Sequence, residues 1–166
     1  MCRLKAGSAF ALVDDDVYER EKVHRWKLDH NGYPYRTIRE LKRSLYLHHA
    51  VLGPAPTKGL LADHINGVTL DARRSNLRWA DASQNQANRR RIRGKVPMKG
   101  VCIHKQTGKF QAQIKVRQRT IYLGLYDNVV DAAQAYSNAA HKYFGEFAYA
   151  SVPPTDNGQA AEARAA

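Results

Sequence analysis

A tight-turn signal and a helix start lie close together between residues 61 and 88, which read LADHINGVTLDARRSNLRWADASQNQAN. Asn66-Gly67 favours a tight turn after the apolar run from Leu60 to Ile65, and we expect Val68–Leu70 to begin the returning strand. The acid and hydroxyl of Asp81–Gln84 are typical of a helix N-terminus, where backbone N–H groups need acceptors. This order, a hairpin followed by a helix, constrains the fold more than any other stretch of the chain.

Polar side chains of the same stretch suit the hydrolysis of a phosphodiester bond with one metal ion. Such a reaction needs a base that deprotonates water and hard oxygen ligands that hold a divalent cation against the phosphate. Asp63, His64, Asn76 and Asn85 supply these groups. Side chains alternate along a strand, so Asp63 and His64 point to opposite sides unless a bulge or the strand end re-aims one of them. Asn85 and Asn88 lie three residues apart, on one face of the predicted helix.

Each part of this pattern also has an ordinary structural explanation. An Asp-His pair near a turn is usually part of a solvated loop, and Asn76 could be a turn residue that bonds to the local backbone. The complete set favours a nuclease site. A scaffold that keeps the set but only binds DNA, as a non-catalytic regulator, stays the alternative hypothesis.

The string DHINGVTLDARRSNLRWADASQNQAN closely resembles the HNH (ββα-metal) endonuclease motif, in particular the phage and intron-encoded homing type. The resemblance covers roughly residues 45–90. It implies that Asp63 and Asn85 are metal ligands, that His64 is the general base, and that Asn76 holds the loop presenting His64. It also implies one divalent ion, Mg²⁺ or Mn²⁺, because both ligands are oxygens. The products would carry 5′-phosphate and 3′-hydroxyl ends.

Several neighbouring side chains have open roles. His48 matches an upstream histidine of the family, but relatives carry a His-Arg pair where this chain has His48-His49. We expect structural packing or phosphate contact for both histidines ahead of metal ligation. Arg74 and Asn88 are further candidates for supporting the ligands or contacting the phosphate.

The charge distribution indicates a nucleic-acid partner. Lys and Arg number 27 against 15 acids, a net charge of +12, and every charged residue from Gln86 to Thr120 is basic. A merely solvated basic face is the alternative, but beside a phosphate-cutting motif we expect a surface that follows duplex DNA. The basic residues of this stretch are Arg89, Arg90, Arg91, Arg93, Lys95, Lys99, Lys105, Lys109, Lys115, Arg117 and Arg119.

From Lys109 to Arg117 polar and apolar residues alternate, which is typical of a half-buried strand in an antiparallel sheet. In the next strand we expect Leu125 on the apolar face and Tyr126 on the polar face. Helical spacing from Val129 to Phe144 predicts one helix across the apolar face. The polar face could then enter a major groove. It would carry Lys109, Gln111, Gln113, Lys115, Arg117 and Tyr122.

Residues 98–148 resemble the Apetala-type DNA-binding domain of plant ethylene-response factors, which phage HNH nucleases also carry. The matching stretches include Lys99-Gly100-Val101, Gly108-Lys109-Phe110 and Tyr122-Leu123-Gly124. Contact positions of that family fall here on Lys99, Cys102, His104, Phe110, Gln113, Lys115 and Tyr122. Because Cys, Phe and Tyr replace the family's residues, we expect backbone contacts rather than a known target sequence. These contacts would come from Lys99, Lys105, Lys109, Lys115, Arg117 and Arg119.

The expected fold class is α+β. An HNH module with an added N-terminal β-hairpin would cover residues 1–88, followed by a basic linker (89–98). A three-stranded antiparallel sheet packed on one α-helix would cover residues 99–150, and a disordered tail residues 151–166. We place the added hairpin at the Asn31-Gly32 turn signal.

Cysteine content and hydropathy set the remaining expectations. Cys2 and Cys102 are too few for a disulfide framework, and we expect no structural zinc. The chain has neither an apolar run of about 18 residues nor a signal-peptide core, so we expect no membrane partner. A cytoplasmic location in a bacterial or phage-infected cell is the default expectation. With one site per chain, we expect a monomer or weak dimer whose natural event on duplex DNA is a nick.

Overall fold

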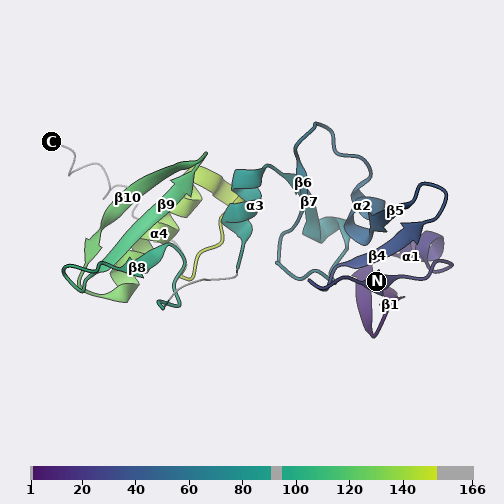
Figure 1. Ribbon diagram of the computed structural model, residues 1–166, viewed down its shortest axis with the longest axis horizontal. Helices are drawn as coiled ribbons and strands as arrows, with labels where there is room; N and C mark the ends of the chain where they lie inside the picture. Colours follow the sequence, from purple (N-terminus) through teal and green to yellow (C-terminus); the bar gives the residue numbers. More distant parts are fainter. Residues whose placement is uncertain (1, 91–94, 153–166) are drawn as a thin grey trace. The chain divides into compact units, whose positions relative to one another are not determined.

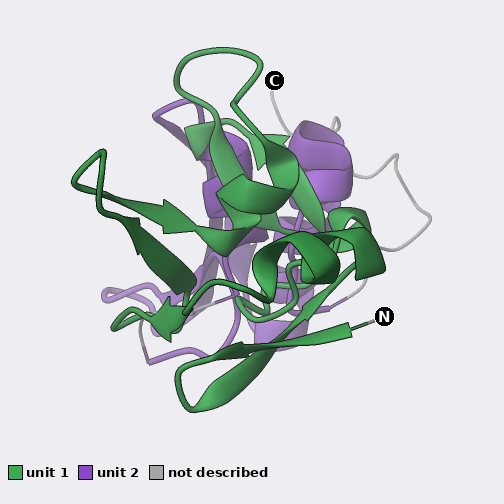
Figure 2. Cartoon of the chain, turned by 90° about the vertical axis from the view of Figure 1, so that its right-hand side faces the viewer, with its two compact units in different colours: residues 1–82 green, residues 83–166 purple. Residues whose placement is uncertain are grey.

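The structure is a computed structural model that describes residues 2–90 and 95–152 (Figure 1). Within these residues the fold is mixed α/β, with four small antiparallel sheets and four α-helices. The chain divides into two compact units, Met1–Ala82 and Ser83–Ala166 (Figure 2). Arg91 and Arg93 of the predicted linker, and residues 153–166 of the predicted tail, lie outside the described residues.

The first unit begins with a hairpin and a short helix that build much of its core. β1 (Cys2–Ala6) pairs with β2 (Ala9–Val13), and α1 (Asp15–Glu21) follows. Alternation along β1 turns every second side chain inward. The buried apolar core of this unit consists of Leu4, Ala6, Ala11, Val13, Val17, Trp26, Leu47, Ala72 and Leu77.

A second sheet joins β3 (Lys27–Leu28), β4 (Pro34–Ile38) and β5 (Arg43–Tyr46), and α2 (Leu47–Leu52) continues from it. The Asn31-Gly32 turn lies between β3 and β4, the position at which the sequence predicts a hairpin. This arrangement matters for function because β5 leads directly into His48 on α2.

β6 (Leu61–His64) pairs with β7 (Leu77–Ala80) to form the hairpin that carries Asp63 and His64. The prediction that Val68–Leu70 begins the returning strand is wrong. Residues 65–76 form a loop that ends in the 3-10 turn η1 (Arg74–Asn76).

The reason is that the middle of this loop pairs with β2 instead of β6. The Leu12 N–H donates to the Leu70 carbonyl at 2.7 Å, and the Ala72 N–H donates to the Leu12 carbonyl at 2.9 Å. Leu12 and Asp71 thereby form an isolated parallel bridge. The N-terminal hairpin therefore anchors the middle of the loop.

The second unit contains α3 (Ala82–Asn88) apart from its first residue, and a sheet in the order β10-β9-β8. β8 spans Val101–Ile103, β9 Phe110–Val116 and β10 Arg119–Tyr126. α4 (Val129–Phe144) covers one face of this sheet (Figure 1). The 3-10 turn η2 (Gly145–Phe147) follows directly after α4. Ala112 and Ile114 of β9 are buried against α4, as the alternation in the sequence predicts.

A β-bulge in β10 reverses the faces of two side chains. The pairing register shifts between Tyr122 and Gly124, and Gly124 has a φ of 139°, which favours glycine. Beyond the bulge, Leu125 lies opposite Gln111, and Tyr126 lies opposite Phe110 and packs against the core. The predicted faces of Leu125 and Tyr126 are wrong because the extra residue inverts the alternation.

No helix in the described part of the chain is long and apolar enough to cross a membrane.

Candidate functional site

His64 lies at the end of β6 and only 5% of it is exposed. Its ring packs against Tyr33, with centroids 5.7 Å apart, and edge-on against His48 at 5.5 Å. Burial lowers the pKa of His64 below its usual value, and the carboxylates of Asp63 and Asp71 partly offset this. The imidazole is therefore neutral near pH 7, which is the state that can accept a proton.

His48 is a packed, neutral ring at the start of α2. It stacks on Tyr46 at 5.4 Å with an interplanar angle of 7°. Burial, followed by the neighbouring His49 and His64, lowers the pKa of His48 to about 3. The side chain is thus an uncharged support for His64, and its geometry favours packing over phosphate contact. His49 is more exposed and lies against Trp79, with centroids 5.7 Å apart.

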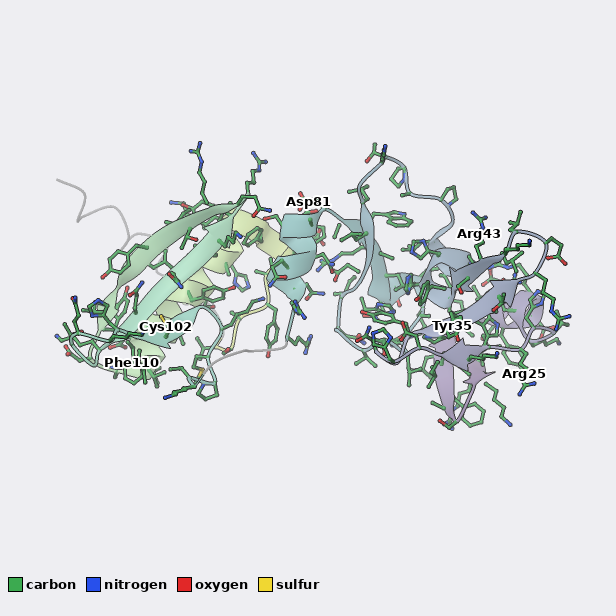
Figure 3. All side chains as sticks on the ribbon, in the orientation of Figure 1. Arg25, Tyr35, Arg43, Asp81, Cys102 and Phe110 are labelled. Carbon is green, nitrogen blue, oxygen red and sulfur yellow. The ribbon has the colours of Figure 1, made fainter. Side chains whose placement is uncertain are left out.

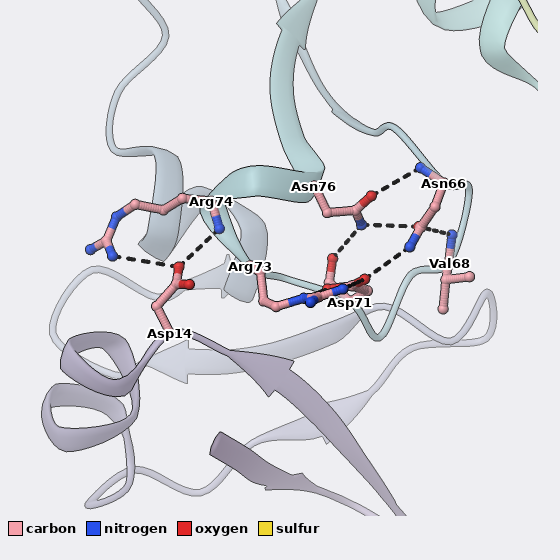
Figure 4. A network of polar contacts seen from close by, with 7 residues as sticks. All are labelled: Asp14, Asn66, Val68, Asp71, Arg73, Arg74 and Asn76. Carbon is pink, nitrogen blue, oxygen red and sulfur yellow. Dashed lines mark hydrogen bonds and ion pairs between the residues drawn. The ribbon is translucent and has the colours of Figure 1, made fainter. Parts of the chain in front are cut away.

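Asn76 joins both ends of the 65–76 loop through its side chain (Figure 4). Its Oδ1 accepts from the Asn66 N–H at 2.9 Å. Its Nδ2 donates to Asn66 Oδ1 at 2.9 Å and to the Asp71 carbonyl at 2.7 Å. The Asn76 carbonyl also accepts from the Ile65 N–H at 2.9 Å, next to His64. A buried amide with these partners fixes the loop where it leaves β6.

Arg74 is engaged with the carboxylates of Asp14 and Asp16 in the N-terminal segment, and Figure 4 shows its contacts with Asp14. Its N–H donates to Asp14 Oδ2 at 2.9 Å, and its guanidinium donates to Asp16 Oδ1 at 2.7 Å and Oδ2 at 2.5 Å. The hydrogen bonds from Arg74 lower the pKa of Asp16 to about 2. Arg74 is a candidate for phosphate contact, and in the structure it ties η1 to the start of α1.

Asp63 and Arg78 form a cross-strand ion pair. They lie directly opposite each other in the β6–β7 register, and Arg78 Nε donates to Asp63 Oδ2 at 2.9 Å. The carboxylate side chain is 6% exposed and the arginine side chain 12%. Asp63 therefore already pairs with a positive group. Its carboxylate oxygens are also suitable ligands for a divalent cation. In the described residues no three His, Cys, Asp or Glu side chains cluster for a metal, although a site with one carboxylate does not need them.

Asn85 and Asn88 lie on α3, whose last turn is fastened within the second unit. The Tyr149 N–H donates to the Ala87 carbonyl at 3.1 Å. The Lys99 ammonium donates to the carbonyls of Ala87 and Gln86 and lies 5.5 Å from the centroid of the Tyr149 ring. A cation at these last carbonyls complements the helix dipole.

Lys99 is expected to contact DNA, and in the structure its ammonium bonds to carbonyls of α3. Burial lowers the pKa of Lys99 to about 8, and its charge is directed into the protein. The local sequence carries no signal for this contact because the aromatic partner, Tyr149, lies far along the chain.

The polar face of the C-terminal sheet carries several of the other expected DNA contacts. Gln113 lies opposite Tyr122, which is 61% exposed, and Gln111 Nε2 donates to Gln113 Oε1 at 3.5 Å. Cys102, opposite Gln111, lies on the same face, and Figure 3 labels it beside Phe110 of the next strand. Lys115 and Arg119 are exposed near the β9–β10 turn.

The remaining basic candidates lie in turns. Arg117 and Gln118 form the β9–β10 turn with φ values of 43° and 71°. Lys105 is exposed in the turn that His104 begins, and His104 Nδ1 lies 3.0 Å from Thr107 Oγ1. Lys109 Nζ pairs with Asp127 at 2.8 Å. Arg89 and Arg90 are exposed after α3.

Comparisons with known proteins agree with a nuclease motif in the segment that carries Asp63 and His64. Residues 47–87 match the family model described as HNH endonuclease. Over 140 residues the chain is 24% identical to a protein of Acanthamoeba polyphaga mimivirus described as an uncharacterized HNH endonuclease, covering 84% of this chain and 73% of that protein. No solved structure matches.

The matched segment contains His48, Asp63, His64, Asn76 and Asn85. HNH nucleases generally use a divalent metal, and the family suggests a nuclease that acts on DNA. The chain carries an HNH endonuclease domain at residues 47–87.

Proposed function

We propose that this chain is a metal-dependent HNH endonuclease of the homing type that hydrolyses phosphodiester bonds in duplex DNA. The observation that carries the proposal is the state of His64. It is buried, its pKa is lowered by that burial, and the loop that follows it is braced by Asn76. In this state His64 Nε2 or Nδ1 can take a proton from the attacking water.

By resemblance to the family, Asp63 and Asn85 would hold one divalent ion, Mg²⁺ or Mn²⁺. When bound, this ion would stabilise the charge that develops on the phosphate and the leaving oxygen. The buried Asp63 carboxylate supports the assignment because oxygen ligands suit these hard cations. Asn76 would hold the loop so that His64 keeps its position during proton transfer. With one such site in each chain, a monomer would nick one strand.

The C-terminal unit would bind the duplex. We propose that the Apetala-type sheet presents Gln111, Gln113 and Tyr122 to a groove, since all three lie on the face that α4 leaves uncovered. Phosphate contacts would come from the exposed cations around it. These cations are Arg89, Arg90, Lys105, Lys115, Arg117 and Arg119.

A plasmid nicking assay tests the proposal. Supercoiled DNA carrying a random-fragment library is incubated with the protein in Mg²⁺, in Mn²⁺ and in EDTA. We expect metal-dependent nicking that is lost in His64→Ala, while DNA binding by that variant stays within about twofold. His24→Ala removes an exposed histidine and serves as the matched control. Equal nicking by His64→Ala would refute the assignment of the base, and binding without cleavage in either metal would favour the non-catalytic regulator.

A further inference from the structure

Arg78 is a largely covered cation for which the proposed reaction has so far no role. It faces Asp63 across the hairpin, with Nε 2.9 Å from the carboxylate, and 12% of its side chain is exposed. The two ends of β7, Leu77 and Ala80, are buried. The arginine is thus built into the hairpin beside a proposed metal ligand.

A buried carboxylate needs a positive partner because an unpaired buried charge is strongly destabilising. In the structure, the guanidinium of Arg78 supplies this charge to Asp63. A divalent ion at the same carboxylate would bring a second positive group next to the guanidinium. Two cations competing for one carboxylate repel each other, so binding of the ion weakens the hold of Asp63 on Arg78.

We propose that Arg78 is the counter-ion of Asp63 in the metal-free protein and moves to a phosphate of the bound DNA when a divalent ion takes the carboxylate. This inference rests on the proposed function. The exchange makes and breaks ion pairs only, and total charge is conserved. The long side chain of arginine and its fork of N–H donors suit both carboxylate and phosphate.

The exchange couples two binding events. DNA provides the phosphate that receives Arg78, so it removes the competitor from Asp63. By linkage, metal binding then strengthens the contact between Arg78 and DNA by the same factor. Arg78 would hold the metal site closed to divalent ions until the substrate is present.

The first test measures Mn²⁺ binding to the full chain without DNA, by electron paramagnetic resonance. Arg78→Gln removes the competing charge, and we expect Mn²⁺ to bind roughly tenfold more tightly than to the parent. Arg78→Lys keeps the charge and should stay close to the parent. Arg43→Gln, which changes an exposed strand arginine, is the matched control and should change nothing.

Thermal unfolding of the same variants checks that they fold. We expect Arg78→Gln to have a lower Tm in EDTA and a larger rise in Tm on adding Mn²⁺ than the parent, because tighter binding to the native state stabilises it more. If Arg78→Gln binds Mn²⁺ no more tightly than the parent, the exchange is refuted. An equal Mn²⁺-induced rise in Tm would refute it as well.

The second test measures the phosphate contact by fluorescence anisotropy with a labelled mixed-sequence duplex, in a His64→Ala background that does not cut. We expect Arg78→Gln to weaken duplex binding severalfold in Mn²⁺ but not in EDTA, where Asp63 holds the arginine. Equal loss in both conditions overturns the proposal.

Asp63→Asn separates this inference from the proposed function. If Asp63→Asn binds Mn²⁺ as the parent does, Asp63 is not a ligand and the proposed metal site itself fails. If Asp63→Asn loses Mn²⁺ while Arg78→Gln gains nothing, the metal site stands and only the exchange is refuted.

Discussion

The hairpins β6–β7 and β9–β10 use their polar side chains in opposite ways. In the first, Asn66, Asp71 and Asn76 bond to one another within a partly buried loop. In the second, Gln113 and Tyr122 pair across the strands on the face opposite to the one that α4 covers. A network that satisfies its own groups fixes their positions, whereas side chains left at the surface keep donors and acceptors for a partner.

The first hairpin is suited to holding catalytic groups in fixed positions, and the second is suited to making contacts with DNA. Proton transfer depends on geometry that is fixed before the substrate arrives, and small misplacements of a catalytic group are costly. Binding along a duplex tolerates side chains that adopt their final conformation only when they contact the DNA. Changes in the first hairpin should therefore alter stability and chemistry together, and changes in the second should alter DNA binding alone.

Asn76→Ala should have the largest effect. It removes three side-chain hydrogen bonds and leaves the Asp71 carbonyl short of a donor in a buried site. We expect the free energy of unfolding to fall by about 2–4 kcal/mol, and nicking to be lost. Urea unfolding followed by tryptophan fluorescence measures the change. The control Asn31→Ala, in an exposed turn, should cost about 0.5 kcal/mol or less; similar losses in both variants would contradict the role of the loop network.

Acid should weaken the first unit next most strongly, through His48. The folded protein keeps this ring neutral down to a pKa of about 3, whereas the unfolded chain takes up the proton near pH 6.5. The contribution of His48 to the free energy of unfolding is therefore fully present above about pH 6.5. It falls as the pH drops toward 3, by about 2 kcal/mol between pH 7 and pH 5.

Unfolding of His48→Phe at pH 7 and pH 5 checks this expectation. Phenylalanine keeps a ring against Tyr46 without a titrating group, so the fall in stability between the two pH values should shrink by most of that amount. An unchanged pH dependence would mean that other groups account for the acid sensitivity.

Local sequence patterns predict much of the structure of these two hairpins. The features that they do not predict depend on contacts between distant segments of the chain. Alternation from Lys109 to Arg117 located β9 and its buried face, because strand period is a local property. The course of the 65–76 loop was missed because its partner, Leu12, lies in β2. The bulge near Gly124 was missed because a single extra residue leaves the apolar spacing almost unchanged.

The site shows the same division. The motif placed Asp63, His64 and Asn76 on one hairpin and its loop, which is where they lie. The motif contains no signal for the side chains that pack around these three residues. Tyr33 and His48 reach His64 from other elements, and nothing in the motif indicates that Arg78 pairs with Asp63. Such partners depend on tertiary packing rather than on spacing along the chain.

Lys99→Met should have a smaller and local effect in the second unit. It removes the ammonium from the carbonyls of Gln86 and Ala87, and we expect a cost of about 1–2 kcal/mol. Hydrogen exchange should show faster opening of α3, with the sheet unchanged. Lys105→Met removes an exposed turn lysine and should leave exchange in α3 as it is. If both variants protect α3 equally, the lysine does not fasten the helix.

The smallest change in stability should come from the uncovered face of the C-terminal sheet. Replacing Gln111, Gln113 and Tyr122 together by Ala removes no buried hydrogen bond, so we expect the free energy of unfolding to change by about 1 kcal/mol or less. Duplex binding should nevertheless weaken at least tenfold at fixed salt. Lys115→Gln should instead lower the slope of log affinity against log salt by about 0.9, since it removes one phosphate contact. A triple variant that binds duplex DNA like the parent would place the recognition surface elsewhere, and the contrast between the two hairpins would then rest on the loop network alone.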